Sequence, residues 1–306
     1  GTISGFTNGG NITATASATG GSASAYGVEA NSIANSIGNF ANSGDMTVTA
    51  TATGGNAYAH GVDAFDIYNF INSGNMTVTA TGGTTYASGV SAEYIGNFTN
   101  TGLISVTAEA DNDAQAGGLN GGDIGNFTNS RDIIVTARGG NATAYSVNVS
   151  SIGNFTNSGN MVVTANATGG NAKAYGVEAS NIDSFTNSGK IEVSATGANV
   201  EVYGVYANNI GSFTNNGNIL VNASGNTINS AALRITGSSN ADITNNGNMT
   251  VVLNVPSGAD MNNVNAAVFW IENSNATISN YGYTWVESNV AGPNLRTLYI
   301  AGSSQV

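Results

Sequence analysis

The chain offers few side chains for acid–base, nucleophilic or metal chemistry. His60 is its only histidine and there is no cysteine, which excludes a histidine metal cluster and any thiolate site. His60 stands where other segments of the chain carry Tyr26, Tyr145, Tyr175 and Tyr203. We therefore interpret it as a structural residue and not as the base of a catalytic triad.

Carboxylates and basic residues are also sparse. Asp111 and Asp113, in AEADNDAQAGG, are candidates for a weak Ca²⁺ site, because Ca²⁺ takes oxygen ligands; a solvated loop is the alternative. Glu29 and Asp63 recur at equivalent positions and could share a cation or point into water. A polysaccharide-cleaving site would need paired acids, or an Arg or Lys base with acidic calcium ligands; the basic candidates are Lys173, Lys190, Arg131 and Arg138. We predict no enzyme activity, no catalytic residue and no cofactor.

The charge balance argues against nucleic acid as a partner. Only 8% of residues are charged, the net charge is −12, and Lys and Arg together number six. Nucleic acid is an unsuitable partner, because neutralising its phosphates needs clustered Lys and Arg.

No apolar run approaches the roughly 18 residues that span a membrane. The first residue is Gly1 and not Met, which fits removal of an export signal.

One repeat of 28–35 residues fills the chain. Its copies are anchored on Phe6, Phe40, Phe70, Phe98, Phe127, Phe155, Phe185, Phe213, Ile243 and Ile278. An Asn follows every anchor by two residues: Asn8, Asn42, Asn72, Asn100, Asn129, Asn157, Asn187, Asn215, Asn245 and Asn280. Stacked copies would therefore place Phe over Phe, as an apolar column, and Asn over Asn, as a ladder of side-chain amides.

The rest of each copy reads as turn, strand, loop and strand. Gly stands two residues after the Asn in every copy except the one with Arg131, and we expect it to supply a positive φ at a tight turn. An alternating strand follows, with inward positions such as Met46 and Val48. A Gly-rich loop absorbs the differences in length, and a short strand such as AYGVEA ends the copy.

These observations predict an all-β fold, a parallel β-solenoid of about ten 28–35-residue rungs with three short strands per rung. We expect a right-handed β-helix, from the crossover preference of parallel strands. Ten rungs at about 4.8 Å each would extend about 48 Å. Residues 1–306 form one domain, in which residues 242–306 are divergent and rich in aromatic side chains.

The segments FTNSGNMVVTA and AYGVEA resemble rungs of bacterial autotransporter passenger domains and related secreted adhesins. The resemblance covers essentially the whole chain. It extends more loosely to Asn/Thr/Gly-rich repeat proteins of prokaryotic sheaths and surface layers. It implies the fold strongly and the function weakly, since such rungs serve adhesins, toxins, enzymes and surface layers alike.

Two sets of surface residues are candidate sites of interaction or modification. Among many N-x-S/T sequons, Asn141 and Asn166 lie in or beside Gly-rich loops and are the better candidates for glycosylation. The divergent C-terminal region carries Trp270, Tyr283, Trp285 and Tyr299. These aromatic residues are either a broader final core or an interface between subunits.

We hypothesise an extracellular protein on the surface of a prokaryotic cell. The first function is a structural subunit of a sheath, surface layer or filament, self-assembling head to tail through its solenoid ends and laterally through its loops. The alternative is an adhesin that binds host surfaces or glycans.

Overall fold

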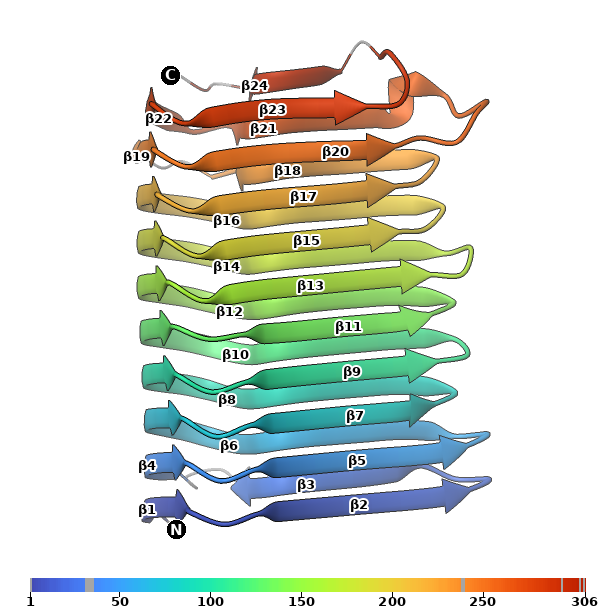
Figure 1. Ribbon diagram of the computed structural model, residues 1–306, viewed down its shortest axis with the longest axis vertical. Helices are drawn as coiled ribbons and strands as arrows, with labels where there is room; N and C mark the ends of the chain where they lie inside the picture. The colour runs from blue at the N-terminus through green and yellow to red at the C-terminus, as the bar shows by residue number, and fades with distance from the viewer. Residues whose placement is uncertain (1, 31–35, 238–239, 293, 303, 305) are drawn as a thin grey trace.

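A computed structural model describes residues 2–30, 36–237, 240–292, 294–302, 304 and 306. The chain winds into an elongated β-solenoid in which two parallel sheets run along the long axis (Figure 1). The described residues contain no α-helix, only the 3₁₀ turn η1 (Met261–Asn263). The predicted all-β solenoid fold is therefore confirmed.

The larger sheet has 14 strands in the described residues. They are β1 (Ile3–Asn8), β3 (Ala23–Ala30), β4 (Ser36–Asn42), β6 (Asn56–Asn72), β8 (Thr84–Asn100), β10 (Asp113–Asn129), β12 (Asn141–Asn157), β14 (Asn171–Asn187), β16 (Asn199–Asn215), β18 (Thr227–Ile235), β19 (Asn240–Asn245), β21 (Val264–Glu272), β22 (Asn275–Asn280) and β24 (Leu295–Ala301).

The second sheet has ten strands, one for each copy of the repeat. They are β2 (Ile12–Thr19), β5 (Met46–Thr53), β7 (Met76–Gly82), β9 (Ile104–Ala110), β11 (Ile133–Gly139), β13 (Asn160–Ala167), β15 (Lys190–Thr196), β17 (Asn218–Ser224), β20 (Asn248–Asn254) and β23 (Tyr283–Ser288).

The three predicted segments of each rung are arranged in these two sheets. In the central rungs the last segment of one copy continues directly into the first segment of the next, as a single 17-residue strand such as β8. The alternating segment forms the second sheet, with every second side chain buried; Met46 and Val48 of β5 are fully buried. Alternation thus places one face of each sheet in a shared core.

The anchor residues stack as a column through the core. Phe40 pairs in register with Phe70, and Phe70 with Phe98. From Phe6 to Phe213, successive ring centroids lie 4.5–5.3 Å apart with planes within 7° of parallel. Ile243 and Ile278 continue the column.

The ten asparagines form the predicted ladder beside that column. Each Nδ2 donates to the Oδ1 of the next copy, from Asn8 to Asn280, at 2.7–2.9 Å. In most rungs the same Nδ2 also donates to a carbonyl of its own turn, as in Asn157 to Gly159. The ladder has a direction, because every amide donates toward the C-terminal neighbour.

The prediction about the turn glycines was wrong. None of them adopts a positive φ; the positive-φ glycines are Gly20, Gly54, Gly169, Gly258 and Gly302, and the first three lie in the loops before the next strand of the larger sheet. The turn glycines have a steric role instead. A Cβ on any of them except Gly10, in the first turn, would overlap the backbone of the preceding turn, as Gly74 would the carbonyl of Gly44. Close stacking of turns, and not φ, selects Gly there.

Candidate interaction surfaces

A groove on the outer side of the larger sheet is lined by aromatic and amide side chains. It is a depression of about 320 Å³ over β6, β8, β10 and β12, lined by Tyr58, Thr84, Thr85, Tyr86, Asp113, Ala114, Gln115, Asn141 and Thr143. Tyr58 is 36% exposed. Aromatic faces beside hydroxyl and amide groups suit a ligand with both apolar and polar faces, such as a sugar ring.

The tyrosine hydroxyls around this groove are held by neighbouring amides. Gln115 Nε2 donates to the Tyr145 hydroxyl at 2.7 Å, and Asn120 Nδ2 donates to the Tyr86 hydroxyl. Burial raises the pKa of both Tyr86 and Tyr145. Both phenols therefore stay protonated near neutral pH, as hydrogen-bonding groups without charge.

His60, on β6, pairs in register with Tyr26 on its N-terminal side and with Ser88 on its C-terminal side. Its ring stacks on Tyr26 with centroids 5.0 Å apart and is tilted against Tyr86 at 5.3 Å. Burial lowers the pKa of His60, opposed by the charge of Asp63. His60 Nδ1 is buried with no hydrogen-bond partner among the described residues. This geometry gives His60 the packing role that its tyrosine equivalents have.

The candidate cation ligands lie in two places, at and just before the start of β10 and on the neighbouring strands β3 and β6. Asp111 and Asp113 are both exposed, and Asp113 accepts a hydrogen bond from Asn141 Nδ2 at 2.8 Å. Glu29 and Asp63 are adjacent in register, but Glu29 is exposed and Asp63 is buried. Within the described ranges, no three His, Cys, Asp or Glu side chains lie close enough together to hold a metal ion.

The four basic candidates for catalysis lie apart. Lys173 pairs with Glu201 at 3.2 Å, Lys190 with Glu192 at 2.5 Å, and Arg138 with Glu109 at 3.2 Å. The side chains in these pairs are 28–58% exposed, so each pair contributes little to stability. Arg131 stands in the turn whose other copies have Gly, and its carbonyl accepts from Asn129.

A cation–π cluster that sequence reasoning missed is centred on Arg234. Its guanidinium carbon lies 5.1 Å from the Tyr203 ring centroid, 5.4 Å from that of Tyr206 and 4.9 Å from that of Trp270. Its Nη2 lies 3.1 Å from Glu272 Oε2. The rung register is the signal that could have found it, because Arg234 is the direct neighbour of Tyr206 and Trp270.

The predicted C-terminal interface residues are divided between core and surface. Trp270 is only 8% exposed and meets the Tyr299 ring edge-on at 5.0 Å. Tyr283 and Trp285, on β23, are 55% and 49% exposed. Of the predicted interface residues, Tyr283 and Trp285 are therefore the ones most exposed for contact with a partner.

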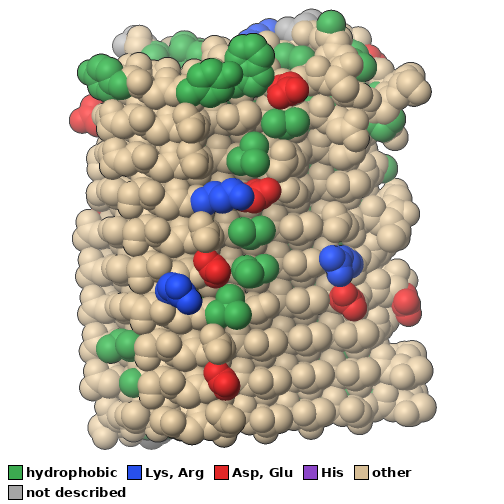
Figure 2. Space-filling model, viewed as in Figure 1, with side chains coloured by type: hydrophobic (Ala, Val, Ile, Leu, Met, Phe, Trp, Pro, Cys, Tyr) green, Lys and Arg blue, Asp and Glu red, His purple; other side chains and the backbone are tan. Residues whose placement is uncertain are grey.

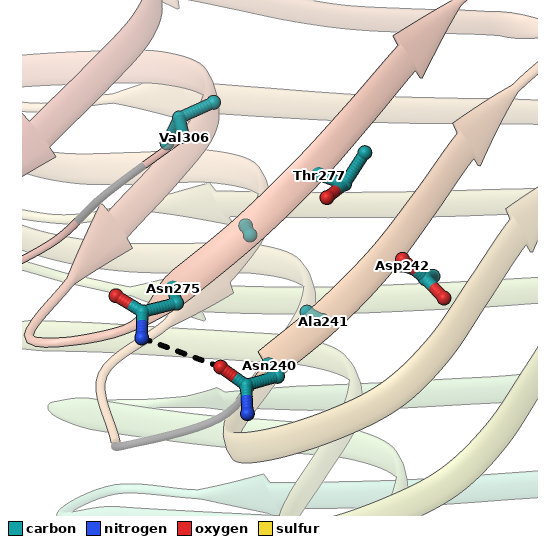
Figure 3. A pocket seen from close by; sticks show the side chains of 7 residues that line it. Asn240, Ala241, Asp242, Asn275, Thr277 and Val306 are labelled. Carbon is teal, nitrogen blue, oxygen red and sulfur yellow. Dashed lines mark hydrogen bonds between the residues drawn. The ribbon is translucent and has the colours of Figure 1, made fainter.

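A second depression, of about 290 Å³, lies over β19 and β22 (Figure 3). Its lining is polar apart from two alanines and Val306, and Asn275 Nδ2 donates to Asn240 Oδ1 across it at 3.3 Å. Asp242 is the one charged side chain in the lining. The site offers hydrogen bonds without a cluster of titratable groups.

The two candidate glycosylation sites differ in accessibility. Asn141 is exposed, but its Nδ2 donates to Asp113 and its Oδ1 accepts from the Asn171 backbone at 2.8 Å. Asn166 is partly exposed on β13. Attachment of a sugar to Asn141 would replace one hydrogen of the Nδ2 that donates to Asp113.

Comparisons with known proteins add no name to these surfaces. No protein-family model, no curated protein and no solved structure matches the chain. Among the described residues there is also no helix of the length and hydrophobicity needed to cross a membrane.

Proposed function

We propose that the chain is a structural subunit of an extracellular sheath, surface layer or filament on a prokaryotic cell. The observation that carries the proposal is the unbroken rung register. All ten copies keep their anchor and their Asn in line from one end of the described structure to the other. A rung of this kind is complementary to any other rung of the same kind.

The direction of the Asn ladder specifies how two copies would stack. Every Nδ2 donates toward the C-terminal side, so a second copy continues the ladder only head to tail. Asn280 would then donate to Asn8 of the next copy. A head-to-tail contact propagates and does not close, which yields a filament. Contacts between the loops that join the two sheets would widen the filament into a layer.

Apolar side chains in the outermost described rungs are less buried than their counterparts in the adjacent rungs. Phe6 and Ile12 are only partly buried, whereas their counterparts Phe40 and Met46 are fully buried. Ile278, at the other end of the anchor column, is likewise partly buried. A further rung of the same repeat would cover these side chains and pair the open strand edges.

The test compares assembly of the 306-residue chain with that of two variants of strand β22. Ile278→Lys puts a charge at the end of the anchor column, and Thr277→Lys puts the same charge on the exposed side of the same strand. We expect the unmodified chain and Thr277→Lys to form filaments at rising concentration, by light scattering and electron microscopy. Ile278→Lys should remain monomeric. A chain that stays monomeric throughout, or two variants that assemble equally, would refute the proposal.

An adhesin is the second candidate, and the groove beside Tyr58 and Tyr86 favours it. A glycan-binding adhesin would lose affinity for its sugar when Tyr58 is replaced by Ala, because a stacking surface is removed. Binding to a panel of immobilised glycans measures this directly. Unchanged binding of the Tyr58→Ala variant would exclude the groove as the binding site.

A further inference from the structure

The second sheet presents a flat array of hydroxyl groups at its N-terminal end. The outward positions of β2, β5 and β7 pair in register across three rungs. We call these nine residues the threonine array: Thr13, Thr15, Ser17, Thr47, Thr49, Thr51, Thr77, Thr79 and Thr81. All nine are exposed or partly exposed.

Inward side chains hold the array in place. Met46, Val48 and Ala50 alternate with the outward residues of β5 and are fully buried. β-Branched side chains such as Thr have few χ1 rotamers. The array is therefore presented by a packed sheet, with each residue carrying one methyl and one hydroxyl group except for Ser17.

The array is free of charge and its hydroxyls are free to bind solvent. None of its hydroxyls bonds to another protein group within the described part of the chain. Figure 2 shows this face, and its lower right area, over β2, β5 and β7, carries no charged side chain. The first outward charge in the Thr81 column is Glu109, on the next strand, which pairs with Arg138.

The spacing of the array is regular in two directions. Neighbouring rungs are about 4.8 Å apart, and alternate residues along a parallel strand are about 6.6 Å apart. Hexagonal ice has a similar two-dimensional repeat of oxygen positions. Along one axis its repeat is slightly shorter than the distance between rungs, and along the perpendicular axis its repeat is slightly longer than the distance between alternate residues. Water that bridges the hydroxyls and covers the methyl groups would therefore be ordered close to the ice lattice.

We propose that the threonine array binds ice. Methyl groups limit how strongly the surface competes for water, and the absence of charge leaves that water free to keep its own hydrogen-bond network. Beyond the array, only the central column, which contains Thr49, continues with Thr in the next three rungs, as Thr107, Thr136 and Thr164. Its neighbours in those rungs include Ile134, Val162 and Arg138, so the regular two-dimensional grid is confined to β2, β5 and β7.

The experiment measures partition of the purified, fluorescently labelled chain into a slowly growing ice hemisphere, together with inhibition of ice recrystallisation. Thr49→Lys replaces the central residue of the array, and Thr51→Lys is a second variant at a more exposed position. Thr164→Lys is the control, because it lies in the same column as Thr49 but outside the array. Circular dichroism establishes that each variant is folded.

We expect the unmodified chain and Thr164→Lys to enter the ice and slow recrystallisation. Thr49→Lys and Thr51→Lys should lose both properties. Exclusion of the unmodified chain from ice would overturn the proposal, as would equal behaviour of all three variants. Binding to powdered crystalline chitin or cellulose, lost in the same two variants without any ice partition, would assign the array to a polysaccharide surface and also overturn it.

Discussion

Replacing one amide of the buried ladder should cost far more stability than replacing an exposed amide of the same rung. Asn157 is fully buried. It accepts from Asn129 Nδ2 at 2.8 Å and donates to Asn187 Oδ1 at 2.8 Å. Asn154, three residues earlier, is exposed and donates to Asn126 Oδ1 at 2.9 Å. The two residues share residue type, copy and a side-chain bond to another rung, but Asn157 is buried and makes more hydrogen bonds.

The expected magnitudes follow from the partners left behind. Asn157→Ala leaves one hydrogen of Asn129 and the side-chain oxygen of Asn187 buried without a partner. Each such group costs about 1–3 kcal/mol, so the loss should be roughly 2–6 kcal/mol. The partner of Asn154 can bond to water instead, and its replacement by Ala should change stability by less than about 0.5 kcal/mol.

Urea unfolding followed by circular dichroism measures both variants. A repeat array can unfold in more than one step, so the transition that shifts should be assigned by hydrogen exchange at the rungs around Asn157. Equal small losses for Asn157→Ala and Asn154→Ala would refute the reasoning. That outcome would mean that water replaces the buried amide inside the solenoid.

Three further predictions concern single columns of the solenoid. Phe127→Asp should be severely destabilising in thermal unfolding, because it places an unpaired charge between two stacked rings. Gly74→Ala should lower the melting temperature, since its Cβ would overlap the turn below, whereas Gly10→Ala has open space around it and should be tolerated. His60→Tyr should leave stability at neutral pH nearly unchanged. Because burial lowers the pKa of His60, the unfolded chain takes up that proton first and stability is lost as pH falls through about 6.5; His60→Tyr should reduce this loss, and an unchanged pH profile would contradict it.

The sequence predicted the rung register because the register depends on residues that recur. Phe127 and Asn129 stand in columns whose members hardly vary, and in-register stacking follows from their spacing. The turn glycines were located correctly but explained wrongly. Their role depends on the distance between successive turns, which spacing along one rung does not reveal.

The surfaces were less predictable because they depend on contacts between rungs of different sequence. The cluster around Arg234 forms where Tyr203 and Trp270 meet it from neighbouring rungs. Trp270 and Trp285 look alike in the sequence, yet one is buried and the other half exposed. The right-handed winding and the extracellular location remain predictions.

Cryo-electron microscopy of surface material from cells that produce the protein tests the proposed function most directly. The account predicts ordered assemblies in which rungs about 4.8 Å apart continue across the boundary between one copy and the next, with the Asn ladder unbroken. Separate copies on the cell surface, with no rung of another copy stacked on them, would contradict it.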